Sequence, residues 1–183
     1  MIRHAAWLCL LLASTAGAQA LQPPLVTVHG TVTTASGDHP AWFTLICTRG
    51  TGAALSMQLA LGMEAAPDFP FDAYEGPRAP ASFQPSARLQ VATHRFAPVP
   101  VSGWRSGERD GAFVFSIATV PGKRGTATDV AAALGEPGET LTWAQSSNDA
   151  QTPPLVAQFT PDARQTLALK RAAAPCLPGH ASR

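Results

Sequence analysis

Apolar and polar positions alternate along the first part of the chain in a way that is typical of β-strands. Residues 25–33 and 54–61 alternate with a period of two, and residues 41–48 are apolar enough for a central strand. Turn-forming residues at 36–40 and 49–52 separate these segments. Because a period of two places every second side chain on one face of a strand, the pattern predicts three consecutive antiparallel strands.

Short apolar segments continue through the rest of the chain without a strand–helix–strand alternation. They predict further strands over 88–94, 112–119, 140–146 and 154–159. Residues 98–107 contain two prolines and two glycines. We therefore expect an irregular connection there, because proline cannot donate to a central ladder.

Helix-start signals occur twice. Thr126 with Asp129 three residues later is a capping-box pattern, and Gly135 can end that helix. Residues 160–162 (TPD) are a second start, for a helix over 161–173. The predicted fold class is mainly β: an antiparallel β-sandwich or a curled sheet of about seven strands with two short helices.

The segment 64–87 contains five prolines and is predicted to be a long ordered loop outside the sheet. Its first part, residues 64–77 (EAAPDFPFDAYEGP), has four carboxylates, three aromatic rings and no basic residue. The rings can fill the edge of the core while the acids face water. Alternatively, the loop can be a recognition surface, stiffened by proline so that little entropy is lost on binding. The acids can also bind calcium, although no EF-hand spacing is present.

The tryptophans add one more candidate, Trp104, which lies outside this loop between Gly103 and Arg105. Trp42 and Trp143 lie on predicted strands and are expected in the core, whereas Trp104 can either anchor in the core or stack on a ligand. The candidate binding residues are therefore Phe69, Phe71, Asp72, Tyr74, Glu75 and Trp104.

The N-terminus has the pattern of an export signal. A basic start, an apolar run of nine residues and small residues ending in Ala18-Gln19-Ala20 follow one another. These features predict a signal peptide over 1–20 and a mature N-terminus at Leu21. The apolar run is shorter than the roughly 20 residues that span a bilayer. We therefore expect a single β-rich domain over 21–183, periplasmic or secreted, with no membrane insertion.

Charge and cysteine content narrow the class of partner and the compartment. Removal of residues 1–20 takes away one basic residue and no acid, which leaves 12 of each. A neutral chain without a basic run has no electrostatic footprint for nucleic acid, so we expect no nucleic-acid partner. Two cysteines remain, Cys47 and Cys176. In an oxidising compartment two cysteines most simply pair, so they are predicted to form a disulfide.

Motifs for catalysis and metal binding do not occur in the sequence. It has no GxSxG or HExxH pattern, and its histidines are scattered. We therefore expect no catalytic residues, no metal and no cofactor. The leading hypothesis is an exported, non-enzymatic protein of the inhibitor, immunity or envelope-accessory type that binds another macromolecule. We expect a protein partner, and the acids of the loop favour a basic one. The alternative is a small envelope hydrolase acting on cell wall or glycan, with the acids of 64–75 and Trp104 as its parts.

Overall fold

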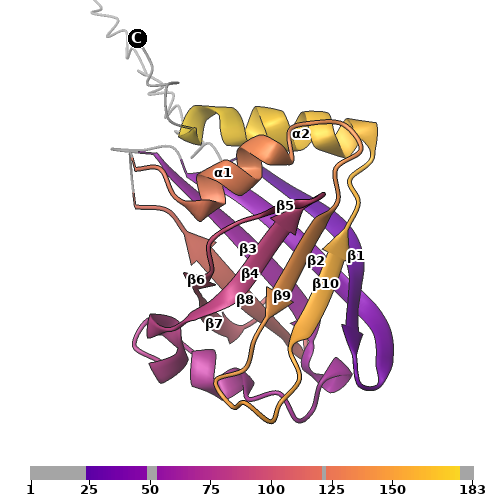
Figure 1. The fold of residues 1–183 in the computed structure, drawn as a ribbon, viewed down its shortest axis with the longest axis vertical. Helices are drawn as coiled ribbons and strands as arrows, with labels where there is room; N and C mark the ends of the chain where they lie inside the picture. The colour runs from indigo at the N-terminus through magenta and orange to yellow at the C-terminus, as the bar shows by residue number, and fades with distance from the viewer. Residues whose placement is uncertain (1–23, 49–52, 121–122, 178–183) are drawn as a thin grey trace, which may run out of the picture.

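The computed structural model describes residues 24–48, 53–120 and 123–177, which form one curled antiparallel sheet with two short α-helices at one end (Figure 1). The predicted signal peptide and mature N-terminus lie outside these residues. The elements in chain order are β1 (Leu25–Thr34), β2 (Gly37–Thr48), β3 (Ala54–Gly62), η1 (Met63–Ala65), η2 (Phe71–Tyr74), η3 (Pro80–Phe83), β4 (Pro85–Val91), β5 (His94–Arg95), β6 (Val99–Pro100), β7 (Ser102–Arg105), β8 (Ala112–Ala118), α1 (Thr126–Ala133), β9 (Leu141–Gln145), β10 (Leu155–Phe159), α2 (Ala163–Ala173) and η4 (Ala174–Cys176).

The mainly β class is confirmed, and of the two predicted architectures the curled sheet is the one that forms. The described residues contain ten strands in the order β5-β4-β9-β10-β1-β2-β3-β8-β7, with β6 paired to β4. The predicted turn at 36–40 is wrong in extent, because β2 already begins at Gly37. Pro40 is tolerated within the strand because β3 pairs with β2 only from Ala41 onwards, so that side of β2 is an edge at Pro40.

The two edges of the curled sheet are joined by the segment that was predicted to be irregular. Val99 and Pro100 pair with β4, and Ser102 to Arg105 pair with β8, so one continuous segment connects the two edges. Gly103 permits this closure, since a Cβ at that position would overlap the Phe113 ring. The prediction failed because proline and glycine indicate breaks in a strand but also mark edge strands and close approaches.

The inside of the closed sheet is filled with side chains, as in small barrels. Every second residue of β3 points inward and is fully buried, from Leu55 to Leu61. Trp143 is fully buried among them, as expected. Trp42 is not in the core as expected: it lies on the outer face of β2, where the Arg109 guanidinium stacks 4.5 Å from its ring centroid.

The helices cover one end of the closed sheet (Figure 1). The Asp162 carboxylate caps α2 by accepting the Gln165 N–H at 2.7 Å, so the second predicted helix is confirmed with its cap inside the TPD segment. The first predicted helix forms as α1, but it begins at Thr126, one residue before the capping-box pattern places it. Its cap is Gly125, whose N–H donates to the Thr128 hydroxyl at 3.0 Å. No helix in the described ranges combines the length and the apolar character that a membrane crossing requires.

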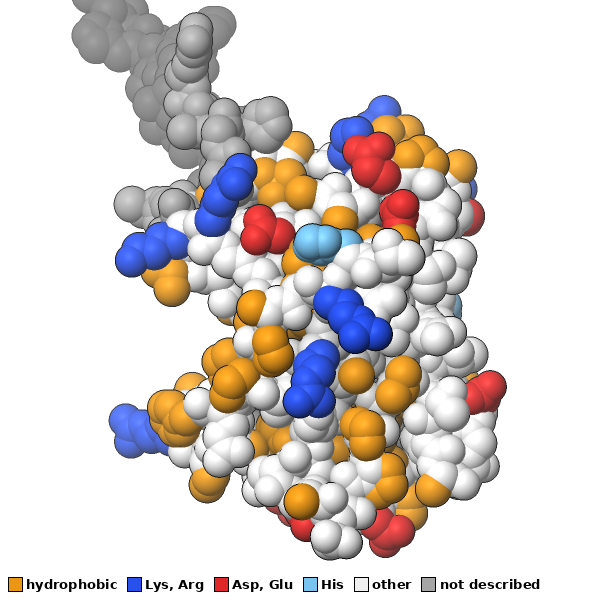
Figure 2. Space-filling view, viewed as in Figure 1, with side chains coloured by type: hydrophobic (Ala, Val, Ile, Leu, Met, Phe, Trp, Pro, Cys, Tyr) orange, Lys and Arg blue, Asp and Glu red, His pale blue; other side chains and the backbone are white. Residues whose placement is uncertain are grey.

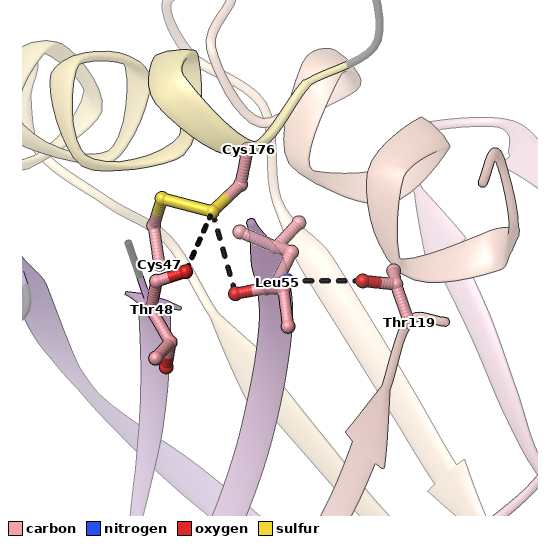
Figure 3. The surroundings of a disulfide bond; sticks show 6 residues. Cys47, Thr48, Leu55, Thr119 and Cys176 are labelled. Carbon is pink, nitrogen blue, oxygen red and sulfur yellow. Dashed lines mark hydrogen bonds between the residues drawn. A yellow bond between two sulfur atoms is a disulfide. The ribbon is translucent and has the colours of Figure 1, made fainter. Parts of the chain in front are cut away.

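The predicted disulfide between Cys47 and Cys176 is confirmed, and it ties η4 to the end of β2 (Figure 3). The two Cα atoms are 5.8 Å apart, and both residues are buried. The Cys176 sulfur also lies 3.3 Å from the Ala54 carbonyl oxygen. Since a disulfide sulfur carries no hydrogen, this approach is a close contact and not a hydrogen bond. A buried disulfide is compatible with an oxidising, extracytoplasmic compartment.

Candidate functional site

The end of the closed sheet opposite the helices is built from four connections, which we call the loop end. They are the β1–β2 turn at 35–36, the segment 63–84, the β7–β8 connection 106–111 and the β9–β10 connection 146–154. The helices lie at the top of Figure 1 and these connections at the bottom. The predicted long loop accounts for most of this end, but it contains three short 3-10 helices and gives way to β4 at Pro85.

The aromatic rings of the long loop close this end from within. Phe69, Phe71 and Tyr74 are all buried. The Phe71 ring centroid lies 5.1 Å from that of Phe69 and 5.1 Å from that of Phe113 on β8. The Tyr74 ring packs edge-on against Phe115, with centroids 5.3 Å apart. Of the interpretations open from sequence, the rings therefore follow the first and plug the core.

Tyr74 also connects the plug to the sheet through its hydroxyl. The hydroxyl donates to the Ser146 carbonyl oxygen at 2.6 Å. Burial raises the pKa of this phenol above its ordinary value of 10.0. Gln145 donates to Ser86 at 2.9 Å and to the same Ser146 carbonyl at 3.1 Å, so β4, β9 and the plug share one hydrogen-bonded cluster. This cluster fixes the loop to the sheet.

The acids of the loop remain at the surface. Asp72 is 77% exposed in its side chain and pairs with Arg105 at the end of β7, with 2.7 Å between Arg105 Nη2 and Asp72 Oδ1. Glu75 lies 4.0 Å from the same guanidinium. One arginine thus stands against two carboxylates, which leaves a net negative charge beside η2.

Acidic residues gather at the loop end as a whole. Eight of the 12 acids of the chain lie in its four connections or within the first strand residues next to them: Asp38, Glu64, Asp68, Asp72, Glu75, Glu108, Asp110 and Asp149. The same stretches contain three basic residues: Arg78, Arg105 and Arg109. The loop end therefore carries a formal charge of −5, although the chain is close to neutral. In the view of Figure 2, acidic side chains reach the lower edge of the face and others lie in its upper part, with basic side chains across the middle.

A cavity of about 300 Å³ opens between three of the loop-end connections. We call it the loop-end cavity. Its walls come from the β1–β2 turn, from the stretch after η1 and from the β9–β10 connection. The lining residues are Thr34, Ala35, Ser36, Ala65, Ala66, Pro67, Asp68, Phe69, Thr152, Pro153, Pro154 and Leu155. Sequence analysis missed this cavity, because its three walls are far apart along the chain.

Trp104 does not anchor in the core; it is 38% exposed on the outer face of β7. Its neighbour across the ladder is Val114, which is followed by Ala60 on β3 and Trp42 on β2. The outer face therefore has a row of apolar side chains, with Arg109 over one end and Trp104 at the other. This row lies on the sheet wall, whereas the other candidate binding residues lie at the loop end.

The described residues bear on two kinds of chemistry, metal binding and paired-carboxylate hydrolysis. Among them, no group of three or more His, Cys, Asp or Glu side chains is placed to hold a metal ion. A paired-carboxylate glycosidase needs two acids in one cleft, whereas the loop-end cavity is lined by one, Asp68. Comparisons of the chain with models of protein families, with the curated proteins and with solved structures found no match.

Proposed function

We propose that this chain is an exported, non-enzymatic protein that binds a basic protein partner through its loop end. One observation carries the proposal: eight of the 12 acids of a nearly neutral chain lie at the loop end, which also holds a preformed, largely apolar cavity with Asp68 in its lining. Patches of one sign are typical of surfaces that steer an oppositely charged partner, and they raise association rates more than affinity. The candidate residues Asp72 and Glu75 supply exposed parts of this region, whereas Trp104 lies on the sheet wall.

The loop end is held in place by several contacts, which supports a role in binding rather than a surface that only faces water. The aromatic plug and the Tyr74 hydroxyl hold the 63–84 segment in place. On another wall, the Ser36 hydroxyl donates to the Ala65 carbonyl oxygen at 3.0 Å and so joins the β1–β2 turn to that segment. A surface that is ordered before binding loses little conformational entropy on association, which favours affinity.

The buried rings change the roles that we assign within the candidate set. Phe69, Phe71 and Tyr74 position the loop from inside, and the carboxylates outside face the partner. Asp72 and Glu75 share Arg105, so their removal deletes a net negative charge and two exposed ion pairs. Exposed ion pairs contribute at most about 1 kcal/mol to stability, so such a variant is expected to fold.

Selection from a random peptide library displayed on phage tests the proposal and does not require an identified partner. We expect the wild-type chain to enrich peptides rich in lysine and arginine, with binding that weakens as salt is raised. Asp72→Ala with Glu75→Ala is expected to lose much of this binding while the free energy of unfolding stays within about 1 kcal/mol of wild type.

The matched control removes two acids at the opposite end, Glu136→Ala with Glu139→Ala. Glu136 also takes part in an exposed ion pair, 3.8 Å from Lys170 Nζ, so both variants delete two negative charges and break at least one exposed ion pair. The control is expected to bind the selected peptides like wild type. Enrichment of neutral or acidic peptides, or equal binding by the two double variants, would rule out the loop end as a surface for basic partners.

A further inference from the structure

We infer that the loop-end cavity receives one lysine or arginine side chain of the partner, with the aliphatic stem along the cavity walls and the charged group at Asp68. This inference rests on the proposed function and specifies how the partner is held. It follows from the lining, the size and the charge of the cavity.

The lining suits the stem of a long basic side chain. Alanines, prolines, Phe69 and Leu155 make up most of the walls, and the polar groups are few. Lysine and arginine bury their methylene stems along apolar surfaces and keep the charged group near water or a counter-charge. A cavity with apolar walls and an acid at its rim matches both parts of such a side chain.

The size admits one long side chain and lies at the lower end of the range for small-molecule ligands. The volume of about 300 Å³ corresponds to roughly ten water molecules at the volume of the liquid. A lysine or arginine side chain has fewer heavy atoms than that and can enter completely. Drug-sized ligands occupy pockets that begin at about this volume and extend to several times more.

The charge at the rim selects a cation. Asp68 is exposed and takes part in none of the ion pairs formed within the described ranges. Asp149 lies beside the cavity, because its carboxylate accepts the Thr152 hydroxyl at 2.8 Å. Hydrogen bonds from the Gln151 N–H and from Thr152 lower the pKa of Asp149, so this acid stays negative.

No lysine or arginine in the walls offsets these acids. Residues 50–77 contain neither, and the same is true of residues 33–48 and 146–158, which form the other two walls. An acidic side chain entering the cavity would be repelled, and a neutral apolar one would gain nothing from the negative potential of these acids. A cationic side chain gains a charge-assisted hydrogen bond at Asp68, which is about twice as strong as a neutral one.

A pair of short peptides tests the assignment directly. The first is a capped Gly-Gly-Arg-Gly-Gly, and the second replaces arginine with citrulline, which has nearly the same shape and no charge. Titrations followed by NMR would report on the amides of Ala65, Ala66 and Leu155. We expect the arginine peptide to shift these amides with at least roughly fivefold tighter binding than the citrulline peptide, and Asp68→Asn to remove that difference.

A second variant fills the cavity without changing any charge. Ala35 is exposed at the cavity rim, so Ala35→Trp places a large ring over the opening. Ala97→Trp makes the same change at an exposed site outside the cavity lining. We expect Ala35→Trp to abolish the shifts at the cavity amides and Ala97→Trp to leave them as in wild type.

The outcomes separate this inference from the proposed function. If Ala35→Trp binds the arginine peptide like wild type, or if the citrulline peptide binds equally well, the cavity does not receive a basic side chain. The proposed function would still stand if the library peptides lose binding in Asp72→Ala with Glu75→Ala. If the library shows no basic enrichment at all, the proposed function fails, and this inference fails with it.

Discussion

Truncation of Phe71 measures how much the aromatic plug contributes to the fold. The side chain is 6% exposed, and its ring lies against Phe69, Phe113 and Phe115, with centroid distances of 5.1, 5.1 and 6.0 Å. Phe71→Ala removes the whole ring from between these neighbours. Buried Phe→Ala changes cost about 3–5 kcal/mol, from lost transfer free energy and the cavity left behind.

We expect the lower part of that range for Phe71→Ala, because the ring lies near the rim, where water can enter the space it leaves. A loss of about 3 kcal/mol in the free energy of unfolding lowers Tm by roughly 6–12 °C in a chain of this size. Circular dichroism during thermal unfolding measures the shift. Urea unfolding gives the free energy independently, provided that the slope against urea is unchanged.

Phe83 provides the control for this experiment. It lies in the same proline-rich segment, at the end of η3, but is 72% exposed. Phe83→Ala deletes the same atoms and is expected to change stability by less than about 0.5 kcal/mol. If Phe71→Ala lowers Tm no more than Phe83→Ala does, the ring is not a plug in solution, and the loop displays its aromatic side chains instead.

Three further predictions concern the covalent and ionisable groups of the chain. Replacement of Cys47 and Cys176 by alanine is expected to cost about 2–5 kcal/mol of unfolding free energy, because the bridge closes a long loop with a sequence separation of 129; a loss under about 1 kcal/mol in urea unfolding would contradict this. Tyr74 is the only tyrosine, so tyrosinate absorbance titrates it alone. Burial raises its pKa, so its contribution to stability is complete below pH 10.0 and is lost as the pH rises through the folded-state pKa above that value. Titration in the folded protein at the ordinary value would disprove the burial. Intact-mass analysis of periplasmic material is expected to give a chain that starts at Leu21, and an unprocessed N-terminus would be evidence against the predicted signal peptide.

Local patterns in the sequence were sufficient for most of the strands. The alternation in residues 54–61 predicted β3 against the helix propensity of its leucines and alanines, because side-chain direction in a strand depends only on the parity of the position. The disulfide was also predictable, since only two cysteines remain after residue 20. Helix ends were predicted within one or two residues, because capping depends on neighbouring side chains.

The closure of the sheet could not be predicted in the same way. Residues 99–105 have the proline and glycine content of a loop, and they become strands only because β4 and β8 lie on either side of them. The outward position of Trp42 has the same origin. A tryptophan on a strand is core or surface according to which face the closed sheet turns inward, and the inner face of β2 is taken by Phe43 and Leu45.

The features of the candidate site also fall into those that the sequence predicts and those that need the tertiary structure. The sequence alone predicted an export signal, a disulfide, a mainly β fold and a proline-rich loop that combines acids with aromatic rings. Only the tertiary structure decided that the rings turn inward, that Arg105 lies between Asp72 and Glu75, and that three distant connections enclose a cavity beside Asp68. The physical reason is the separation of the interacting residues along the chain. Strand patterns and helix caps arise between residues a few positions apart. The cavity walls, and an ion pair such as that of Arg105 with Asp72, need distant segments that only the closed sheet brings together.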